Sequence, residues 1–141
     1  MKKNRNYLLK TSAVTIVAIV CFSQVFAQKA EKVKIVKTSQ QNKIDVLIGD
    51  KLFTSFLYPD TLEKPVLYPV RAANGTVVTR GFPLNTQPGD PTDHPHHIGI
   101  WFTYENVNGL DFWNNSYAIP ADKKHLYGWI RTDKILETSG G

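Results

Sequence analysis

Three of the four histidines of this 141-residue chain lie close together, in the segment Asp93-His94-Pro95-His96-His97. In an extended backbone alternate side chains share a side, so His94 and His96 would face one way and His97 the other. Neutral imidazole ligates divalent metals, and its ordinary pKa of about 6.5 permits proton transfer near neutral pH. The segment therefore predicts a chemical site in which His94, His96 and His97 act as acid–base groups or as ligands.

The residue types leave three interpretations of these histidines open. In the first, His94 and His96 ligate copper, iron or zinc together with Asp93. The spacing selects none of the further ligands that a complete metal site needs, and the candidates are Asp90, Glu105, Asp111 and His125. In the second, the imidazoles bind substrate and transfer protons without a metal. In the third, they hydrogen-bond backbone carbonyls and carboxylates, and only fasten the proline-rich residues 83–95 to a sheet.

Aromatic and polar residues surround the histidines in the sequence. Sugars stack their C–H faces on aromatic rings, while their hydroxyl groups bind polar side chains. The candidates for such contacts are Trp101, Tyr104, Trp113, Asn108, Asp111 and Arg80. Trp101 and Phe102 would face opposite sides of a strand, so we expect at least one of them to belong to the core. The pattern predicts a carbohydrate or polyol ligand, with Arg80 or Asn108 stabilising charge on a sugar oxygen.

Strands and turns are expected to position these residues. Alternating apolar residues on either side of Gly49 predict a hairpin over residues 43–58. Asn74-Gly75 and Asn108-Gly109 predict two further tight turns, because both residue types accept positive φ. Other strands are expected at residues 66–70, 76–79, 98–104, 110–113, 127–132 and 135–138. No segment combines helical periodicity with caps, so the sequence predicts an all-β fold, an antiparallel β-sandwich.

The first 27 residues have the pattern of a secretory signal peptide. Residues 1–10 are basic and residues 11–20 are apolar but too short to span a bilayer, and small residues precede a cleavage site after Ala27. An uncleaved anchor is an alternative, as is a lipoprotein attached through Cys21, although Val20 disfavours the latter. The prediction is a signal peptide at 1–27 and a periplasmic or secreted domain at 28–141, with no membrane span after cleavage.

Charge and cysteine content exclude several classes of function. Four of the 17 basic residues lie in the first ten positions, so the remaining 13 nearly balance the 12 acidic residues. This balance argues against nucleic-acid binding, which needs a basic face. Cys21 is the one cysteine of the chain. The domain at 28–141 therefore has no disulfide, thiol nucleophile or cysteine zinc site.

The end of the sequence also carries an expectation. Ile135-Leu136 enters a strand-like stretch, and Ser139-Gly140-Gly141 follows where a turn to a partner strand would begin. A sheet that stopped there would keep an unpaired edge. We therefore expect residues 28–141 to be an incomplete, N-terminal part of a larger sandwich.

Two stretches are distinctive, PVLYPVRAANGTVVTRGFPLN from Pro65 and GDPTDHPHHIGIWFTYENVNGLDFW from Gly89. They resemble the bacterial methane oxygenase PmoA-like family of uncharacterised exported proteins, and the resemblance extends over residues 33–141. It implies a soluble β-sandwich longer than this chain, found mainly in sugar-degrading bacteria. The implied site residues are Arg80, Asp93, His94, His96, His97, Asn108 and Asp111.

Together these observations predict an exported protein that binds carbohydrate or polyol, or acts on it through histidine acid–base chemistry. One alternative is a copper- or iron-dependent oxygenase, with His94 and His96 as ligands and Asp93 or Asp111 orienting an imidazole. Another is a non-catalytic binding or structural module. The sequence leaves open whether the protein is an enzyme.

Overall fold

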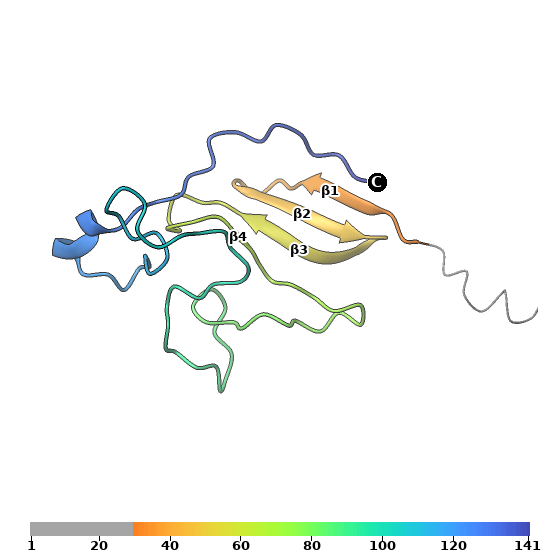
Figure 1. The fold of residues 1–141 in the computed structure, drawn as a ribbon. Coiled ribbons are helices and arrows are strands. Elements are labelled where there is room, and N and C mark those ends of the chain that lie inside the picture. The colour runs from red at the N-terminus through yellow and green to blue at the C-terminus, as the bar shows by residue number, and fades with distance from the viewer. Residues whose placement is uncertain (1–29) are drawn as a thin grey trace, which may run out of the picture. The chain divides into compact units, whose positions relative to one another are not determined.

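Four strands form one antiparallel sheet in the order β1-β2-β3-β4 (Figure 1). The computed structural model describes residues 30–141, so the expected signal peptide lies outside the described residues. The strands are β1 (Val33–Lys37), β2 (Lys43–Ile48), β3 (Lys51–Leu57) and β4 (Val66–Leu67), and a short 3-10 helix η1 spans Ala121–Leu126. The all-β class is confirmed. A second sheet, which a sandwich requires, is not formed within residues 30–141, so the sandwich stays a prediction.

The first predicted hairpin is confirmed as β2 and β3. Gly49 has a φ of +61°, a backbone conformation that glycine adopts without strain, and the turn at residues 49–50 joins the two strands. Ile44 pairs with Phe56, and Ile44 is buried. Each residue of such a pair faces the same side of the sheet, so the apolar alternation in the sequence becomes one apolar face.

The Asn74-Gly75 turn is also confirmed, but its flanking strands are much shorter than predicted. The Ala72 N–H donates to the Thr76 carbonyl at 2.8 Å, and Gly75 has a φ of +86°. The two segments that flank this turn form a single isolated bridge, between Arg71 and Val77, and β4 ends at Leu67. Pro69 has no N–H to donate to a ladder, which accounts for the early end of β4.

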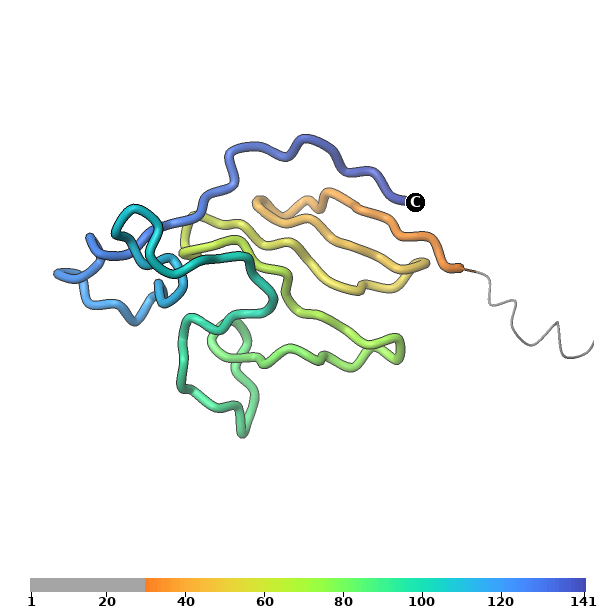
Figure 2. Tube along the Cα trace, viewed as in Figure 1, coloured from red at the N-terminus to blue at the C-terminus, as the bar shows by residue number. Residues whose placement is uncertain are grey.

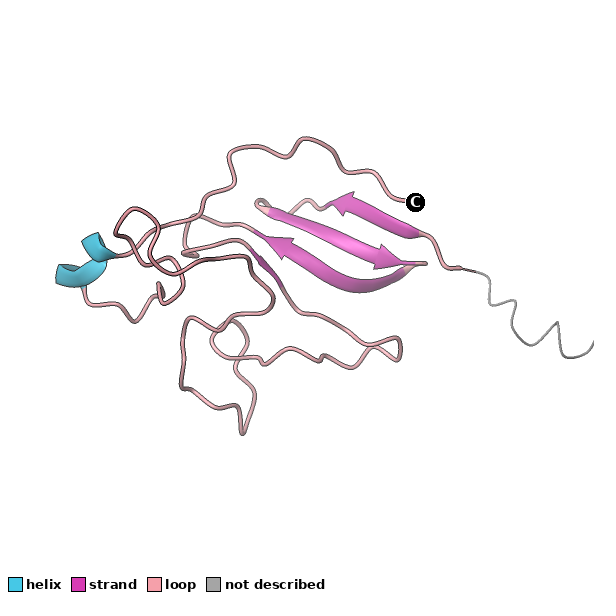
Figure 3. Cartoon of the chain, viewed as in Figure 1, coloured by secondary structure: helices cyan, strands magenta, loops and turns pink. Residues whose placement is uncertain are grey.

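Most of the chain after β4 is irregular, as Figure 3 shows, and the strands predicted at 98–104, 110–113, 127–132 and 135–138 are wrong. Gly99, with a φ of +55°, bends the backbone, so only Ile100 pairs with β4. The last residues instead run alongside β1 (Figure 2), where the Val33 N–H donates to the Gly141 carbonyl at 2.8 Å. No helix within residues 30–141 is long and apolar enough to cross a membrane.

A small core attaches the histidine segment to the sheet. Val66, Tyr68 and Ile98 are its buried members, and partly buried apolar side chains that include Trp101 pack against them. Ile98 directly follows His97, so burial of Ile98 fixes the end of the histidine segment. Leu67 and Ile100 add two backbone hydrogen bonds of 2.8 and 3.0 Å. The core and this bridge therefore hold the candidate site in place.

Replacing Gly99 tests this attachment. A Cβ at Gly99 would clash with the Leu67 carbonyl oxygen, whereas a Cβ at Gly109, which also has positive φ, meets open space. We expect Gly109→Ala to lower the free energy of unfolding by about 1 kcal/mol through backbone strain alone, and Gly99→Ala by about 3 kcal/mol. Urea denaturation measures both variants, and equal losses would contradict the close packing of Gly99 on β4.

Candidate functional site

The three clustered histidines lie on a turn, and their rings gather together. The His97 N–H donates to the His94 carbonyl at 2.9 Å, and His94 has a φ of +48°. Ring centroids are 4.9 Å apart for His94 and His97, 4.3 Å for His96 and His97, and 5.7 Å for His94 and His96. The expectation that His97 faces away from the other two is wrong, because the backbone turns here instead of remaining extended.

Asp93 orients the first imidazole of the cluster. Its Oδ2 lies 2.7 Å from Nδ1 of His94, and this hydrogen bond, with the nearby charge of Arg80, lowers the pKa of the Asp93 carboxyl. A carboxylate that accepts from Nδ1–H leaves Nε2 as the basic nitrogen of a neutral imidazole. His94 is about half exposed, so Nε2 belongs to a ring that solvent and ligands can reach.

Arg80 holds the Asp93 segment. Its guanidinium donates to the Asp93 carbonyl at 2.9 Å and to the Pro91 carbonyl, and it lies 3.5 Å from the Asp93 carboxylate. These contacts direct the guanidinium toward the protein. In this geometry Arg80 is a positioning residue for Asp93, in contrast to the predicted role of Arg80 as a group that contacts a sugar oxygen.

Two tryptophans flank the imidazoles. The ring of His97 lies 5.6 Å from that of Trp101 and 6.4 Å from that of Trp113, and the two indoles are 6.0 Å apart at an angle of 60°. Trp113 is 41% exposed, whereas Trp101 packs against the core. We call the rings of His94, His96, His97, Trp101 and Trp113 the imidazole–indole cluster. Trp113 is its accessible aromatic face.

Other predicted site residues lie outside this cluster. Tyr104 is 69% exposed and has no ring contact with the cluster among the aromatic pairs of residues 30–141. Asn108 is exposed at the tip of the Asn108-Gly109 turn, with a φ of +52°, and this turn is confirmed. Its residue type is therefore explained by the backbone conformation of the turn.

Asp111 shapes the loop that carries Trp113. Its carboxylate accepts from the Asn114 backbone N–H at 2.9 Å and from the Asn114 side chain at 2.6 Å. Burial raises the pKa of Asp111, but these hydrogen bonds and the charge of Lys64 outweigh it, and the pKa is lowered. The predicted sugar-binding carboxylate is thus engaged within its own loop.

Lys64 is a residue of the site that the sequence analysis did not identify. It is only 1% exposed, and its Nζ donates to the carbonyls of Trp113 at 2.7 Å and Phe112 at 3.2 Å. Burial lowers the pKa of Lys64 to about 8, against the opposing effect of the negative charges of Glu63 and Asp111. Lysine is almost never fully buried, and its position next to Pro65 before an apolar strand gives no sign of burial.

Burial keeps the inner imidazoles neutral near pH 7. It lowers the pKa of His96 to about 4, and the neighbouring charges of His97, Lys64 and His94 act in the same direction. Burial also lowers the pKa of His97, with the charges of His94 and Arg80 adding to the effect. Neutral imidazoles both accept and donate hydrogen bonds, so these two side chains suit hydroxyl groups better than anions.

The predicted metal ligands do not form a complete set. No three histidine, cysteine, aspartate or glutamate side chains within residues 30–141 are arranged to hold a metal ion. Asp93 is engaged by Nδ1 of His94 and by Arg80, so in this structure it orients an imidazole.

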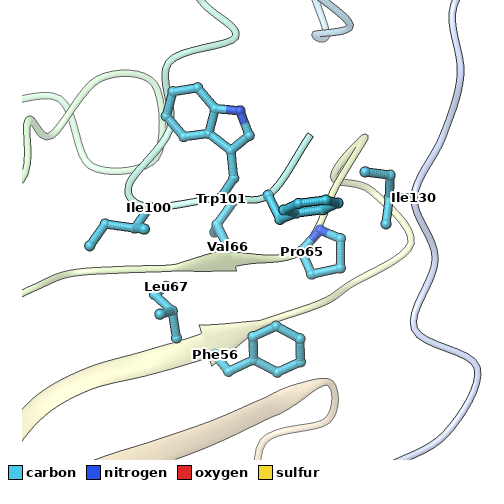
Figure 4. Close-up of a pocket in the computed structure, with 8 residues that line it drawn as sticks. Phe56, Pro65, Val66, Leu67, Ile100, Trp101 and Ile130 are labelled. Carbon is cyan, nitrogen blue, oxygen red and sulfur yellow. The ribbon is translucent and has the colours of Figure 1, made fainter. Parts of the chain in front are cut away.

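An apolar pocket of about 460 Å³ lies on the side of the Trp101 backbone that faces away from the imidazole–indole cluster (Figure 4). Its lining consists of Phe56, Pro65, Val66, Leu67, Ile100, Trp101, Phe102 and Ile130. The indole of Trp101 points away from Phe56 and Leu67, as Figure 4 shows, and reaches the imidazoles instead. The pocket and the imidazole–indole cluster thus share one stretch of backbone but few side chains.

The lowered pKa of His96 predicts acid sensitivity. In the unfolded chain a histidine takes up a proton near pH 6.5, whereas folded His96 does so near pH 4, so the unfolded state binds more protons between these values. The free energy of unfolding should therefore fall as the pH is lowered from 6.5 to 4. Urea denaturation across this range should show a smaller fall for His96→Gln than for the parent.

The matched control for this experiment is His125→Gln, since His125 is exposed on η1. This variant should keep the acid sensitivity of the parent. An equally steep fall in His96→Gln would contradict the burial of a neutral His96.

Comparison with known proteins gives a family and no activity. A family model described as "Family of unknown function (DUF6807)" matches residues 43–141. No curated protein matches the chain, and no solved structure does. The matched region contains the whole imidazole–indole cluster, and the resemblance to PmoA-like proteins stays a prediction. Because the match covers more than half of its length, the chain belongs to the DUF6807 family.

Proposed function

We propose that this protein binds a carbohydrate or polyol outside the cytoplasm, and that His94 supplies acid–base chemistry to the bound ligand. The observation that carries the proposal is the gathering of three imidazoles, of which His97 packs against two indoles and His94 is oriented by a carboxylate. The location of the protein rests on the leader-like residues 1–27 alone.

The surface of the cluster suits a sugar ring. Trp113 offers a partly exposed aromatic face, and aromatic faces stack on the C–H groups of sugars. His97 lies beside Trp113 and His96 lies beside His97, and both imidazoles have lowered pKa values, so they are neutral near pH 7. Neutral imidazoles can exchange hydrogen bonds with hydroxyl groups without requiring a charged ligand.

His94 and Asp93 supply the proton-transfer chemistry. The Asp93 carboxylate fixes the ring of His94 through Nδ1, and Arg80 fixes Asp93 in turn. Nε2 of His94 would accept a proton from a ligand hydroxyl, and the adjacent carboxylate would stabilise the imidazolium that forms. His94 then gives this proton back to the ligand or to water and becomes neutral again.

The metal-dependent oxygenase and the non-catalytic module are the alternatives to this proposal. An oxygenase using copper or iron would hold the metal with His94 and His96, and the Asp93 carboxylate on Nδ1 of His94 would then orient that imidazole with Nε2 toward the metal. A non-catalytic module would bind sugar through Trp113 without needing His94. The following experiments test the ligand class and the metal requirement.

Removal of the Trp113 ring tests sugar recognition. We expect a glycan array and calorimetric titration of the best-bound sugar to show about tenfold weaker binding in Trp113→Ala, because loss of a stacking contact of about 1.4 kcal/mol raises the dissociation constant tenfold. Tyr117→Ala is the control, since Tyr117 is an exposed aromatic residue outside the cluster. Absence of any bound sugar in the parent protein, or equal binding in Trp113→Ala, would refute the proposed ligand class.

Metal removal tests the oxygenase alternative. We expect the purified protein to keep its sugar affinity after dialysis against a chelator, because the proposed contacts come from rings and imidazoles. Elemental analysis should accompany the titration. Stoichiometric copper, iron or zinc that is lost in a His94→Ala, His96→Ala double variant would favour the oxygenase, whereas a His125→Ala variant should leave metal content and binding unchanged.

A further inference from the structure

Lys64 lies next to the imidazole–indole cluster, between the sheet and the loop that carries Trp113. It precedes β4 by two residues, and Val66 of β4 pairs with Leu57. The neighbouring Glu63 accepts a backbone hydrogen bond of 3.0 Å from Ile130. The backbone of Lys64 is therefore held by the sheet on one side and by the C-terminal segment on the other.

The ammonium group of Lys64 is used entirely inside the protein. Nζ donates to the Trp113 carbonyl at 2.7 Å and to the Phe112 carbonyl at 3.2 Å, and it lies 5.7 Å from the centre of the Trp101 ring. A buried ammonium needs such partners, since an unpartnered one would be strongly destabilising. Its one-percent exposure excludes direct contact with a ligand that stays on the surface.

The contacts of Lys64 bear directly on the position of Trp113. Neighbouring parts of that loop are bound elsewhere, since Asp111 exchanges backbone hydrogen bonds of 3.0 Å with Leu126 and Gly128, and Asn115 donates to the Gly128 carbonyl at 2.7 Å. At Trp113 itself, the carbonyl is bound by Lys64. The partly exposed indole has ring contacts with only His97 and Trp101 among residues 30–141.

We propose that Lys64 is the positioning residue that holds Trp113 against His97 and so builds the accessible aromatic face of the site. This inference rests on the proposed function, because it assigns the face to ligand binding. Lys64 connects the sheet to two consecutive carbonyls and lies beside the other indole. It thereby sets the location of the Trp113 backbone relative to Trp101 and the imidazoles.

The first test observes Trp113 without any ligand. The chain has 3 tryptophans, so 5-fluorotryptophan labelling should give three fluorine resonances, and a Trp113→Phe variant assigns that of Trp113. In Lys64→Met, a side chain of similar length without a donor, we expect the Trp113 resonance to shift or broaden while that of Trp129 stays in place. Lys124→Met on the exposed η1 should change neither resonance. An unchanged Trp113 resonance in folded Lys64→Met would overturn the inference.

The second test connects the position of the ring to binding. We expect Lys64→Met to weaken sugar binding about tenfold in the parent background and to have no further effect in Trp113→Ala, because both changes remove the same face. An equal loss in both backgrounds would overturn the inference, since Lys64 would then act independently of Trp113. If no sugar binds at all, the proposed function fails, and the fluorine spectrum still decides the role of Lys64.

A second variant covers the case in which Lys64→Met does not fold. Lys64→Gln keeps one amide donor for a carbonyl of the loop. We expect Lys64→Gln to shift the Trp113 resonance less than Lys64→Met does. Its sugar affinity should lie between that of the parent protein and that of Trp113→Ala. A Lys64→Gln protein that folds and matches Trp113→Ala in binding, with an unmoved Trp113 resonance, would overturn the inference.

Discussion

The hydrogen bonds between Leu67 and Ile100 are the constraint on which the candidate site depends. β4 has only two residues, and Leu67 pairs with Phe56 of β3 on one side and with Ile100 on the other. This bridge, together with buried Val66 and Ile98, attaches the irregular residues that follow to an otherwise regular sheet. The histidine turn directly precedes the bridge and Trp101 directly follows it. The relative positions of the imidazoles and the indole therefore follow from two backbone hydrogen bonds.

The irregular region has little apolar core, and buried polar side chains help to hold its loops in place. The side chains of Lys64 and Asn115 are almost fully buried; Nζ of Lys64 donates to the Trp113 and Phe112 carbonyls, and Nδ2 of Asn115 donates to the Gly128 carbonyl. Buried polar groups of this kind are costly when a partner is lost, so they favour one arrangement of the loops. Burial also lowers the pKa of His96. The site therefore combines neutral imidazoles with the ammonium group of Lys64, which a ligand cannot reach.

The sequence predicted the parts of the structure that depend on local patterns. Alternation around Gly49 identified the β2–β3 hairpin, and Asn108-Gly109 identified a turn in which both residues have positive φ. The segment after the histidines could not be predicted in the same way, since a strand forms only where a partner lies beside it. Residues 98–104 have the composition of a strand, but Gly99 bends the chain and a single residue pairs. Non-local contacts decided this outcome.

The same limit applied to the site. Clustering in the sequence drew attention to the histidines, but the left-handed backbone of His94 places all three rings together, and nothing in the residue types indicates that conformation. Lys64 was missed because a buried lysine and a surface lysine look alike in a sequence.

The alternation of side chains along residues 100–102 relates the imidazole–indole cluster to the apolar pocket. The Trp101 indole belongs to the imidazole–indole cluster, whereas Ile100 and Phe102 line the apolar pocket. Adjacent residues of this stretch thus contribute to different surfaces. Substitutions at Ile100 or Phe102 can therefore reshape the pocket while the rings of the cluster keep their contacts, whereas a substitution at Trp101 alters both surfaces at once.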